Sequence, residues 1–360
     1  MDFQRRIDTV RDELAERDGD AAVFAGAAPS QYLSGFSSYA SAGTRQWYPL
    51  VVVPRDGEAC LLVSGLDRAA ARETAAIPVQ VADGSFSDAI QDMLVEGATV
   101  LVSDTVTAGL YSRLSESLDV TFDRVLDDIR AVKEEAEVAA IRSAVETTEA
   151  VFAETVKQID PGMTESAVAG LVEKGMRERG GMAGFPPVVA VGSRAAHPHH
   201  APGDTTVGKG PVLFDIGAWH DGYVADIART IHVGSPTDRF REVYNAVREA
   251  QEAAEGALMP GADPAAVDEA ARDVLAAAGY DEDYPHPTGH GVGLSVHEPP
   301  KISFSADQPL EAGNVVTLEP AVYLDGEFGV RIEDVYVLGD DGAERLTQGS
   351  RALEDHIASV

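Results

Sequence analysis

Residues 213–230 read LFDIGAWHDGYVADIART, a stretch in which two acids, Asp215 and Asp226, interrupt otherwise apolar or glycine-bounded runs. Burying an ionised carboxylate without compensation is strongly unfavourable, so these acids need a partner. They are an odd number of residues apart and would face opposite sides of one unbroken strand. The HDG sequence at 220–222 predicts a turn that places them on adjacent antiparallel strands, where both can point into one pocket.

Three further stretches share this pattern of an ionisable residue in apolar or glycine-rich surroundings: PTGHGVGLSVHEPP (287–300, with His290), VVTLEPAVY (315–323, with Glu319) and FGVRIEDVYV (328–337, with Glu333). The DGEFG sequence at 325–329 separates the two glutamates as a second turn. Four such carboxylates and one histidine predict a shared compensating charge, and divalent metal is the simplest one. Oxygen-rich ligation with one nitrogen suits Mn²⁺, Co²⁺ or Zn²⁺ better than a thiolate site would.

These five positions resemble those of the pita-bread metallopeptidases, the family that holds methionine aminopeptidases, aminopeptidase P and prolidase (Xaa-Pro dipeptidase). Its pattern is an Asp, a second Asp eleven positions on, a His in GHGxG, a Glu before Pro and a late Glu. All five match here without substitution. The resemblance implies two divalent ions, with Mn²⁺ expected before Co²⁺ or Zn²⁺. Two-metal aminopeptidase sites hold their ions about 3.5–4 Å apart around a bridging hydroxide.

The resemblance also implies how the two ions are held. Asp226 and Glu333 should bridge both ions, and Asp215 should chelate one of them. His290 and Glu319 should hold the other. Glu319 is also the expected proton shuttle, because a carboxylate beside the nucleophile can take its proton and pass it to the leaving amine.

Other residues match family positions outside the ligand set. His297, in VHEPP, is expected to stabilise the tetrahedral intermediate and to contact substrate. His199, in HPHHAPGD, matches a histidine near the scissile bond, with the neighbouring His197 and His200 as alternatives. Arg331 lies where prolidase-like members carry an arginine that can fix the substrate or the late glutamate.

The chain is long enough for two domains. We expect an α/β (α+β) fold: a creatinase/prolidase-like α/β domain over residues 1–130, then a pseudo-twofold pita-bread domain over residues 131–360. The first half carries short apolar runs separated by glycine, charge or helical patterns, at 21–26, 48–55, 59–65, 77–83 and 99–104. Its PSQYLSGF segment (29–36) resembles a "YLtGF" element of prolidase-like amino-terminal domains.

Helical periodicity is clear at residues 4–17 and from Glu134 to Lys157. PGMTESAV at 161–168 and PGADPAAV at 260–267 resemble each other, and each precedes a helix, a histidine-bearing loop and strands with two acids. This repetition predicts a duplicated half in which each copy contributes one pair of carboxylates. Chance similarity between two short stretches is the alternative.

Sixty acids against 28 bases give a net charge of −32, and only five of the bases are lysine. Such a surface repels itself at low ionic strength and becomes tolerable when salt screens it. We interpret it as adaptation to a salt-filled cytoplasm, and a merely acidic mesophilic enzyme is the alternative. The charge argues against nucleic acid or an anionic membrane as a partner.

The cysteine count and the lack of long apolar runs bear on the cellular compartment in which the protein works. Cys60 is the single cysteine, which excludes an internal disulfide and fits a reducing compartment. No run approaches the ~18 apolar residues of a membrane span, and the first residues lack a signal-peptide core. We therefore expect a cytoplasmic protein, and the resemblance implies a homodimer. Trp47 is interpreted as a packed aromatic, or as part of a loop reaching the partner's site.

We therefore expect a metallopeptidase that cleaves Xaa-Pro bonds in short peptides, either a dipeptidase or an aminopeptidase P. An amino-terminal domain favours this function over that of methionine aminopeptidase. The alternatives are a same-fold hydrolase of a non-peptide substrate such as ectoine, and a non-enzymatic pita-bread binding protein. Four histidines are interpreted as structural or surface residues: His220, His232, His286 and His356.

Overall fold

The computed structural model describes residues 1–38, 49–306 and 308–358, so Trp47 lies outside the described residues. The chain divides into two compact units, Met1–Arg130 and Ala131–Val360. Each unit is described by itself. No helix in the described part of the chain is both long and apolar enough to cross a membrane.

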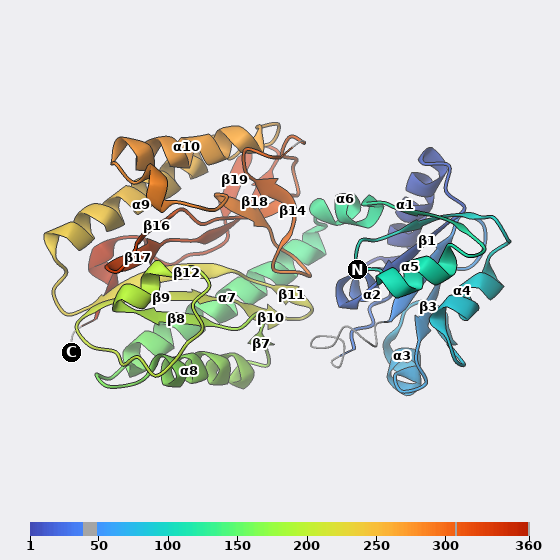
Figure 1. Ribbon diagram of the computed structural model, residues 1–360, viewed down its shortest axis with the longest axis horizontal. Coiled ribbons are helices and arrows are strands. Elements are labelled where there is room, and N and C mark those ends of the chain that lie inside the picture. Colours follow the sequence, from blue (N-terminus) through green and yellow to red (C-terminus); the bar gives the residue numbers. More distant parts are fainter. Residues whose placement is uncertain (39–48, 307, 359–360) are drawn as a thin grey trace. The chain divides into compact units, whose positions relative to one another are not determined.

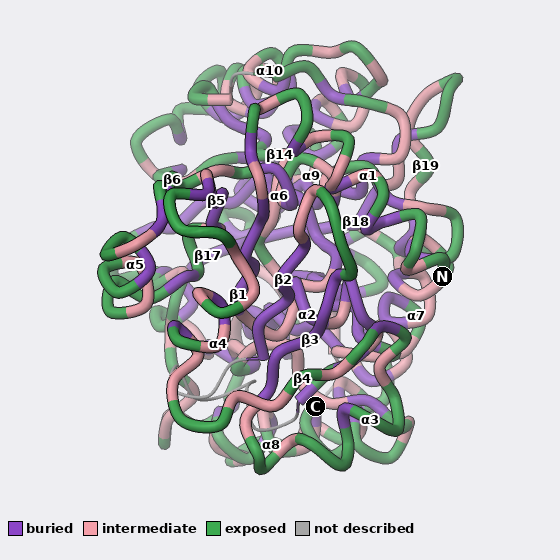
Figure 2. The backbone as a smooth tube through the Cα atoms, turned by 90° about the vertical axis from the view of Figure 1, so that its right-hand side faces the viewer, coloured by how far each residue is buried: buried purple, intermediate pink, exposed green. Residues whose placement is uncertain are grey.

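The first unit is built on a mixed six-stranded sheet with the order β4-β3-β2-β1-β5-β6. Its strands are β1 (Ala21–Ala25), β2 (Leu50–Pro54), β3 (Cys60–Val63), β4 (Val79–Val81), β5 (Thr99–Val102) and β6 (Asp119–Phe122). Strand β1 pairs antiparallel with β2 and parallel with β5. Continuous apolar strands of this kind are buried on both faces, and Figure 2 shows β2 and β3 buried along their length.

Helices cover this sheet: α1 (Phe3–Glu16), α2 (Ala27–Ser34), α3 (Arg68–Thr74), α4 (Phe86–Met93), α5 (Ala108–Leu114) and α6 (Val125–Ala131). The predicted amphipathic helix at residues 4–17 is α1, which buries Ile7, Val10 and Leu14. The side chain of Asp2 accepts a hydrogen bond from the Arg5 amide and so caps its first turn. The PSQYLSGF segment lies mostly within α2.

Four long helices belong to the second unit: α7 (Glu135–Gln158), α8 (Glu165–Glu178), α9 (Asp238–Ala257) and α10 (Pro264–Ala277). The long helix predicted from Glu134 to Lys157 is α7. Thr164 caps α8 by accepting a hydrogen bond from the Ala167 amide, and Asp263 caps α10 in front of Pro264. In this unit α9 and α10 lie on one side of the strands, and α7 and α8 lie on the other (Figure 1).

The strands of the second unit form four sheets. One sheet contains β8 (Val188–Val191), β9 (Gly210–Ile216), β12 (Ile227–Val233) and β20 (Ile357–Ala358). Strands β7 (Met182–Ala183), β10 (Ala218–His220) and β11 (Tyr223–Val224) form a second. The others are β13 (Gly289–Gly291), β14 (Glu298–Ile302), β15 (Val315–Leu318), β18 (Asp334–Gly339) and β19 (Gly342–Arg345), and the pair β16 (Ala321–Leu324) with β17 (Phe328–Arg331).

The second unit therefore has two halves with similar element order. Helices α7 and α8 precede the hairpins of β9–β12, and α9 and α10 precede those of β15–β18. The turn predicted at 220–222 is present: Asp221 and Gly222 both have positive φ (50° and 91°), as a tight hairpin between twisted strands requires. The turn predicted at 325–329 joins β16 to β17.

Candidate metal centre

The first pair of acids lies on one face of the β9–β12 ladder. Asp215 is opposite Ala228, and Asp226 is two residues from Ala228, so both carboxylates project to the same side. The ladder is interrupted at Gly217, where a Cβ would lie 1.8 Å from the Ala225 carbonyl oxygen. Only glycine lets the two strands approach this closely, so Gly217 sets the place of Asp226.

The second pair is built in the same way. The β15–β18 ladder ends at the Leu318–Asp334 pair, and the β16–β17 hairpin begins beyond it in the same register. Glu319 and Glu333 are therefore opposite each other in the gap between the two ladders. Asp226, Glu319 and Glu333 thus lie where the two long hairpins are interrupted, and Asp215 lies in the ladder next to the first interruption. The interruptions free backbone groups for contacts with other strands.

Those backbone groups join the two hairpins to the histidine strand. The Glu333 amide donates to the Ala228 carbonyl (3.0 Å), and the Glu319 amide donates to the Thr288 carbonyl (2.7 Å). Thr288 leads directly into β13, where a Cβ on Gly289 would lie 1.9 Å from the carbonyl oxygen of Thr317. The close packing of β13 on β15 brings His290 alongside the acids.

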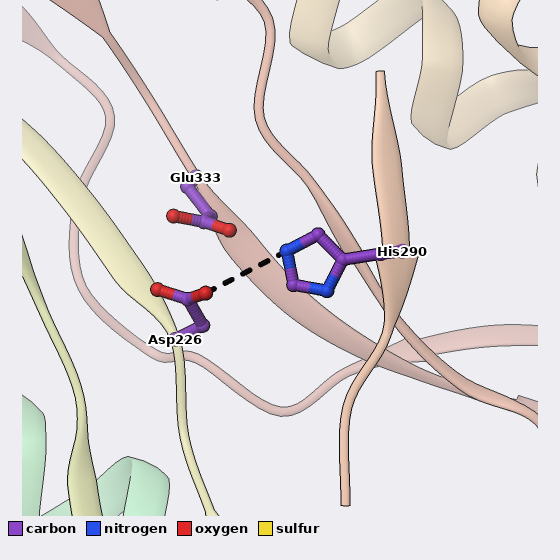
Figure 3. Close-up of side chains that lie close together, drawn as sticks. All are labelled: Asp226, His290 and Glu333. Atoms are coloured by element: carbon purple, nitrogen blue, oxygen red, sulfur yellow. Dashed lines mark ion pairs between the residues drawn. The ribbon is translucent and has the colours of Figure 1, made fainter. Parts of the chain in front are cut away.

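Three side chains from the three segments converge (Figure 3). One ligand atom from each of Asp226, His290 and Glu333 lies within 4.8 Å of the other two, and all three residues are buried. The His290 Nε2 atom is 3.6 Å from Oδ2 of Asp226 and 3.6 Å from Oε1 of Glu319. Glu319 therefore belongs to the same cluster.

Asp215 reaches the same pocket but is paired with Arg331. The buried guanidinium donates through Nη1 to Oδ2 of Asp215 and through Nε to the hydroxyl of Tyr323 (2.8 Å). Its Nε also lies 3.8 Å from Oε2 of Glu319. Arg331 thus supplies one positive charge at the edge of a group of four carboxylates. Among the described residues, its guanidinium donates no hydrogen bond to the side chain of Glu333.

The buried acids carry more negative charge than their surroundings compensate. Burial, together with the neighbouring carboxylates, raises the pKa values of Asp226 and Glu333 well above the usual range. Burial raises the pKa of Glu319 to about 7, although Arg331 opposes the shift. In the described part of the chain, Oδ1 of Asp226 and Oε1 of Glu333 are buried without a hydrogen-bond partner. Buried orphan oxygens of this kind call for a cation.

The state of His290 also fits metal ligation. Burial lowers the pKa of His290 to about 3, so the imidazole is neutral, which is the form that binds metal. Its Nδ1 lies 3.1 Å from the Gly291 carbonyl, a bond that leaves the Nε2 lone pair facing the acids. Carboxylate oxygens with one imidazole nitrogen are a donor set that fits Mn²⁺, Co²⁺ or Zn²⁺.

The two histidines expected to act on substrate lie beside this cluster. The ring of His297 is 4.2 Å from the ring of His290, measured between centroids. His199 is exposed on the turn after the 3₁₀ helix Gly192–Ala196. Partial burial lowers the pKa of His297, and His199 lies close enough to lower it further. The neighbouring His200 is instead hydrogen-bonded to buried Glu165 (2.8 Å), which supports His199 as the family match.

Two residues at the site were missed from the sequence. His286, interpreted as structural or surface, places Nδ1 4.0 Å from Oε2 of Glu319 and Nε2 3.0 Å from the Tyr323 hydroxyl. His286 therefore lies beside the cluster, with its ring nitrogens paired to the Pro287 carbonyl and the Tyr323 hydroxyl. Spacing was the one signal for both residues, because an even separation along a strand puts two side chains on the same face. His286 is four residues before His290, and Tyr323 is four residues after Glu319. His232 and His356 are buried and pair with backbone carbonyls, as structural residues do.

Comparisons with known proteins agree with this architecture. The model of metallopeptidase family M24 matches residues 139–340, and that of the creatinase/prolidase N-terminal domain matches residues 6–132. An Xaa-Pro dipeptidase from Pyrococcus furiosus is 35% identical over 309 residues, covering 84% of this chain and 88% of that protein.

Solved structures extend the similarity to the whole chain. A prolidase from Thermococcus sibiricus is 32% identical with a TM-score of 0.92, and the match covers 100% of both chains. An X-Pro aminopeptidase from Thermotoga maritima is 33% identical with a TM-score of 0.88, covering 98% of this chain and 99% of that one. The expected creatinase-like and pita-bread architecture is confirmed, and the chain belongs to metallopeptidase family M24.

Proposed function

We propose that this protein cleaves Xaa-Pro bonds in short peptides, as a dipeptidase or an aminopeptidase P that uses two divalent ions. The observation that carries this function is the convergence of Asp226, His290 and Glu333, with buried carboxylate oxygens that lack partners. The substrate class is supported by the relatives, which include an Xaa-Pro dipeptidase and an X-Pro aminopeptidase. Because both kinds resemble this chain closely, the preferred peptide length is left to the assay.

The expected roles divide the ligands between two ions, with Mn²⁺ as the first candidate. Asp226 and Glu333 would bridge both ions, while His290 and Glu319 hold one and Asp215 the other. Arg331 engages only Oδ2 of Asp215 among the described residues, so Oδ1 is available. Divalent ions at such a site supply activation of a water molecule and polarisation of the peptide carbonyl.

Glu319 is suited to move a proton during the reaction. As a ligand beside the activated water, its carboxylate could take up a proton and later release it. We assign it the transfer of a proton from the attacking water to the leaving proline nitrogen. His286 lies nearby, with Nδ1 4.0 Å from the Oε2 atom of Glu319.

We assign His297 and His199 to the substrate rather than to the ions. Both are exposed, whereas the proposed ligand His290 is buried. We assign His297 to the oxygen that becomes negative when the carbonyl is attacked. His199 and Arg331 would orient the peptide. We further propose that the enzyme acts as a homodimer in the cytoplasm of a halophile, in line with its composition.

A metal-reconstituted assay tests the function. The protein is stripped with chelator, reloaded with Mn²⁺ and given Ala-Pro, Ala-Pro-Pro, Met-Ala and ectoine in parallel. Asp226→Asn, prepared in the same way, serves as the control for contaminating peptidases. Cleavage of the bond before proline supports the proposal. Hydrolysis of ectoine alone would instead identify a non-peptide hydrolase, and failure with every substrate would favour a binding protein.

A further inference from the structure

A buried ion pair lies behind the site, between Lys133 and Glu298. The Lys133 Nζ and the Glu298 Oε1 atoms are 2.9 Å apart, and the two side chains are only 1% and 5% exposed. Among the described residues, a second lysine–glutamate pair, Lys174 with Glu178, is 63% and 58% exposed. Burying both charges costs desolvation energy that such a pair often fails to recover, so stability alone is a weak reason for it.

The lysine end of the pair is rigidly held. The Lys133 amide donates to the Gly313 carbonyl (2.8 Å), and the neighbouring Val132 forms an isolated bridge with Asn314. The Asn314 side chain returns a hydrogen bond to the Ala131 carbonyl (3.0 Å), which also accepts from Nζ of Lys133 (3.3 Å). The ammonium group is therefore fixed relative to the turn that leads into β15.

The glutamate end fills the inside of a loop. Residues 293–297 form bends between β13 and β14, without a strand or helix ladder of their own. The Glu298 Oε2 atom accepts a hydrogen bond from the Ser295 amide (3.2 Å). A Cβ on Gly293 would lie 2.3 Å from Oε1 of Glu298, so the carboxylate packs directly on this glycine. One side chain thus holds both ends of the loop.

His297 is the last residue of this loop and immediately precedes Glu298. The centroid of its ring lies 4.2 Å from that of the His290 ring, and the two ring planes are tilted by 57°. We propose that Lys133 is a positioning residue: by pairing with Glu298 it fixes the 293–297 loop and so holds the His297 imidazole beside the ligand cluster. The link to turnover rests on the proposed function, whereas the effect on the loop does not.

Removal of Lys133 should loosen the loop because the Glu298 charge remains buried. Without Lys133, the buried Glu298 carboxylate loses an opposite charge 2.9 Å away, and turning toward water becomes more favourable than filling the loop. The Ser295 amide then loses its acceptor, and His297 gains freedom. Replacing both partners, as in Lys133→Met with Glu298→Gln, removes both charges and keeps an oxygen that can accept from Ser295.

Amide hydrogen exchange tests the effect on the loop. In Lys133→Met we expect exchange in the peptide covering residues 293–298 to rise about tenfold, with other peptides of the second unit unchanged. The double variant should return toward the wild-type rate. Lys174→Met, which breaks the exposed pair, is the matched control and should leave the loop unaffected. Unchanged exchange in Lys133→Met would overturn the proposal.

A double-mutant cycle with His297→Ala tests the effect on turnover. With Ala-Pro and saturating Mn²⁺, Lys133→Met should lower kcat about tenfold, while KM and bound Mn²⁺ stay within about twofold. In the His297→Ala background the same substitution should cost less than about twofold in kcat. An equal loss in both backgrounds would show a general structural role and refute the assignment.

Two further measurements separate a loss of folding from a loss of loop order. Thermal unfolding is recorded for each variant, and if Lys133→Met fails to fold, Glu298→Ala is measured with the same expectations because it empties the loop directly. If the wild-type protein cleaves no Xaa-Pro peptide, the proposed function fails, while the exchange of the 293–298 peptide still decides whether Lys133 holds the loop.

Discussion

The neutral imidazole of His290 directs Nε2 toward Oδ2 of Asp226 at 3.6 Å, a separation too long for a hydrogen bond. The other oxygen of Asp226 is buried without a partner among the described residues, as is one oxygen of Glu333. A lone pair facing carboxylates at this distance is explained by a cation that lies between them. The first prediction therefore concerns the two acids that would bridge the ions.

Asp226→Asn and Glu333→Gln should each lose bound metal and turnover. Each substitution removes a carboxylate charge that two ions would share, so we expect Mn²⁺ affinity to fall about 10- to 100-fold or more. Metal content after dialysis and titration calorimetry measure this loss. Asp221→Asn, at the exposed tip of the β10–β11 hairpin, is the control and should bind normally. Full metal content with full activity in either variant would refute the bridging role.

Asp334→Asn should destabilise the second unit severely. Asp334 is fully buried and accepts hydrogen bonds from Arg229, Arg351 and Thr347. Removing its charge takes the carboxylate partner from buried Arg229 and leaves Arg351 with Glu255, and breaking a buried pair of this kind costs about 3–5 kcal/mol. Urea unfolding in the presence of chelator measures the loss without a contribution from metal. Asp340→Asn, in the exposed turn that follows the same strand, should change stability by less than about 0.5 kcal/mol.

Arg229 connects the ion pairs of Asp334 to the backbone of the candidate metal centre. Its guanidinium also donates to the backbone carbonyls of Glu333 and Ala228, one in each acid-bearing hairpin. Some loss of metal affinity in Asp334→Asn is therefore expected along with the loss of stability. A variant that unfolds at the same urea concentration as the wild type would contradict the importance of this ion network.

Cys60 should be unreactive in the folded protein. Burial in β3, aided by the negative charge of Glu58, raises the pKa of the thiol from 9.0 to about 11. Because the folded-state pKa is raised, the thiolate that reacts forms only as pH rises toward that value. At pH 8 we expect a thiol reagent to modify the native protein about a hundredfold more slowly than the urea-unfolded protein. Equal rates in the two states would show that the thiol is accessible and ordinary.

Much of each acid-bearing hairpin could be predicted because its information is local. Asp215 and Asp226 are eleven positions apart and joined by one tight turn, so apolar pattern and turn residues are enough to place both on one face. The same holds for Glu319 and Glu333 across the β16–β17 hairpin. The meeting of both hairpins with His290 was expected from the buried charges and the family resemblance, not from local pattern, because it depends on contacts between distant segments.

The side-chain partners inside the site could not be predicted in the same way. Arg331 was expected to fix the substrate or Glu333, yet it pairs with Asp215 from the other hairpin. Lys133 was merely one of five lysines in a strongly acidic chain, and its burial against Glu298 depends on the turn at Gly313. Such pairs follow from the direction in which each strand presents its side chains after packing, which periodicity alone does not specify.

The acidic composition predicts dependence on salt. With a net charge of −32, repulsion between exposed carboxylates should destabilise the protein in dilute buffer. We expect both activity and melting temperature to be lower in about 0.05 M KCl than in about 2 M KCl, because the screening length shortens from more than 10 Å to below 3 Å. Sucrose of equal osmolality is the control, since it screens no charge. Behaviour that is the same in all three solutions would exclude adaptation to salt.

His297→Ala should separate catalysis from metal binding. His297 is exposed beside buried His290 and lies outside the group formed by Asp226, His290 and Glu333. If it acts on the oxygen that becomes negative in the transition state, its loss should lower kcat about 10²- to 10³-fold while bound Mn²⁺ changes little. Metal analysis and steady-state kinetics on the same preparation give both values, with His220→Ala as a control for loss of an imidazole. A fall in metal content that matches the fall in kcat would show that His297 is a metal ligand, and it would refute its assignment to the substrate oxygen.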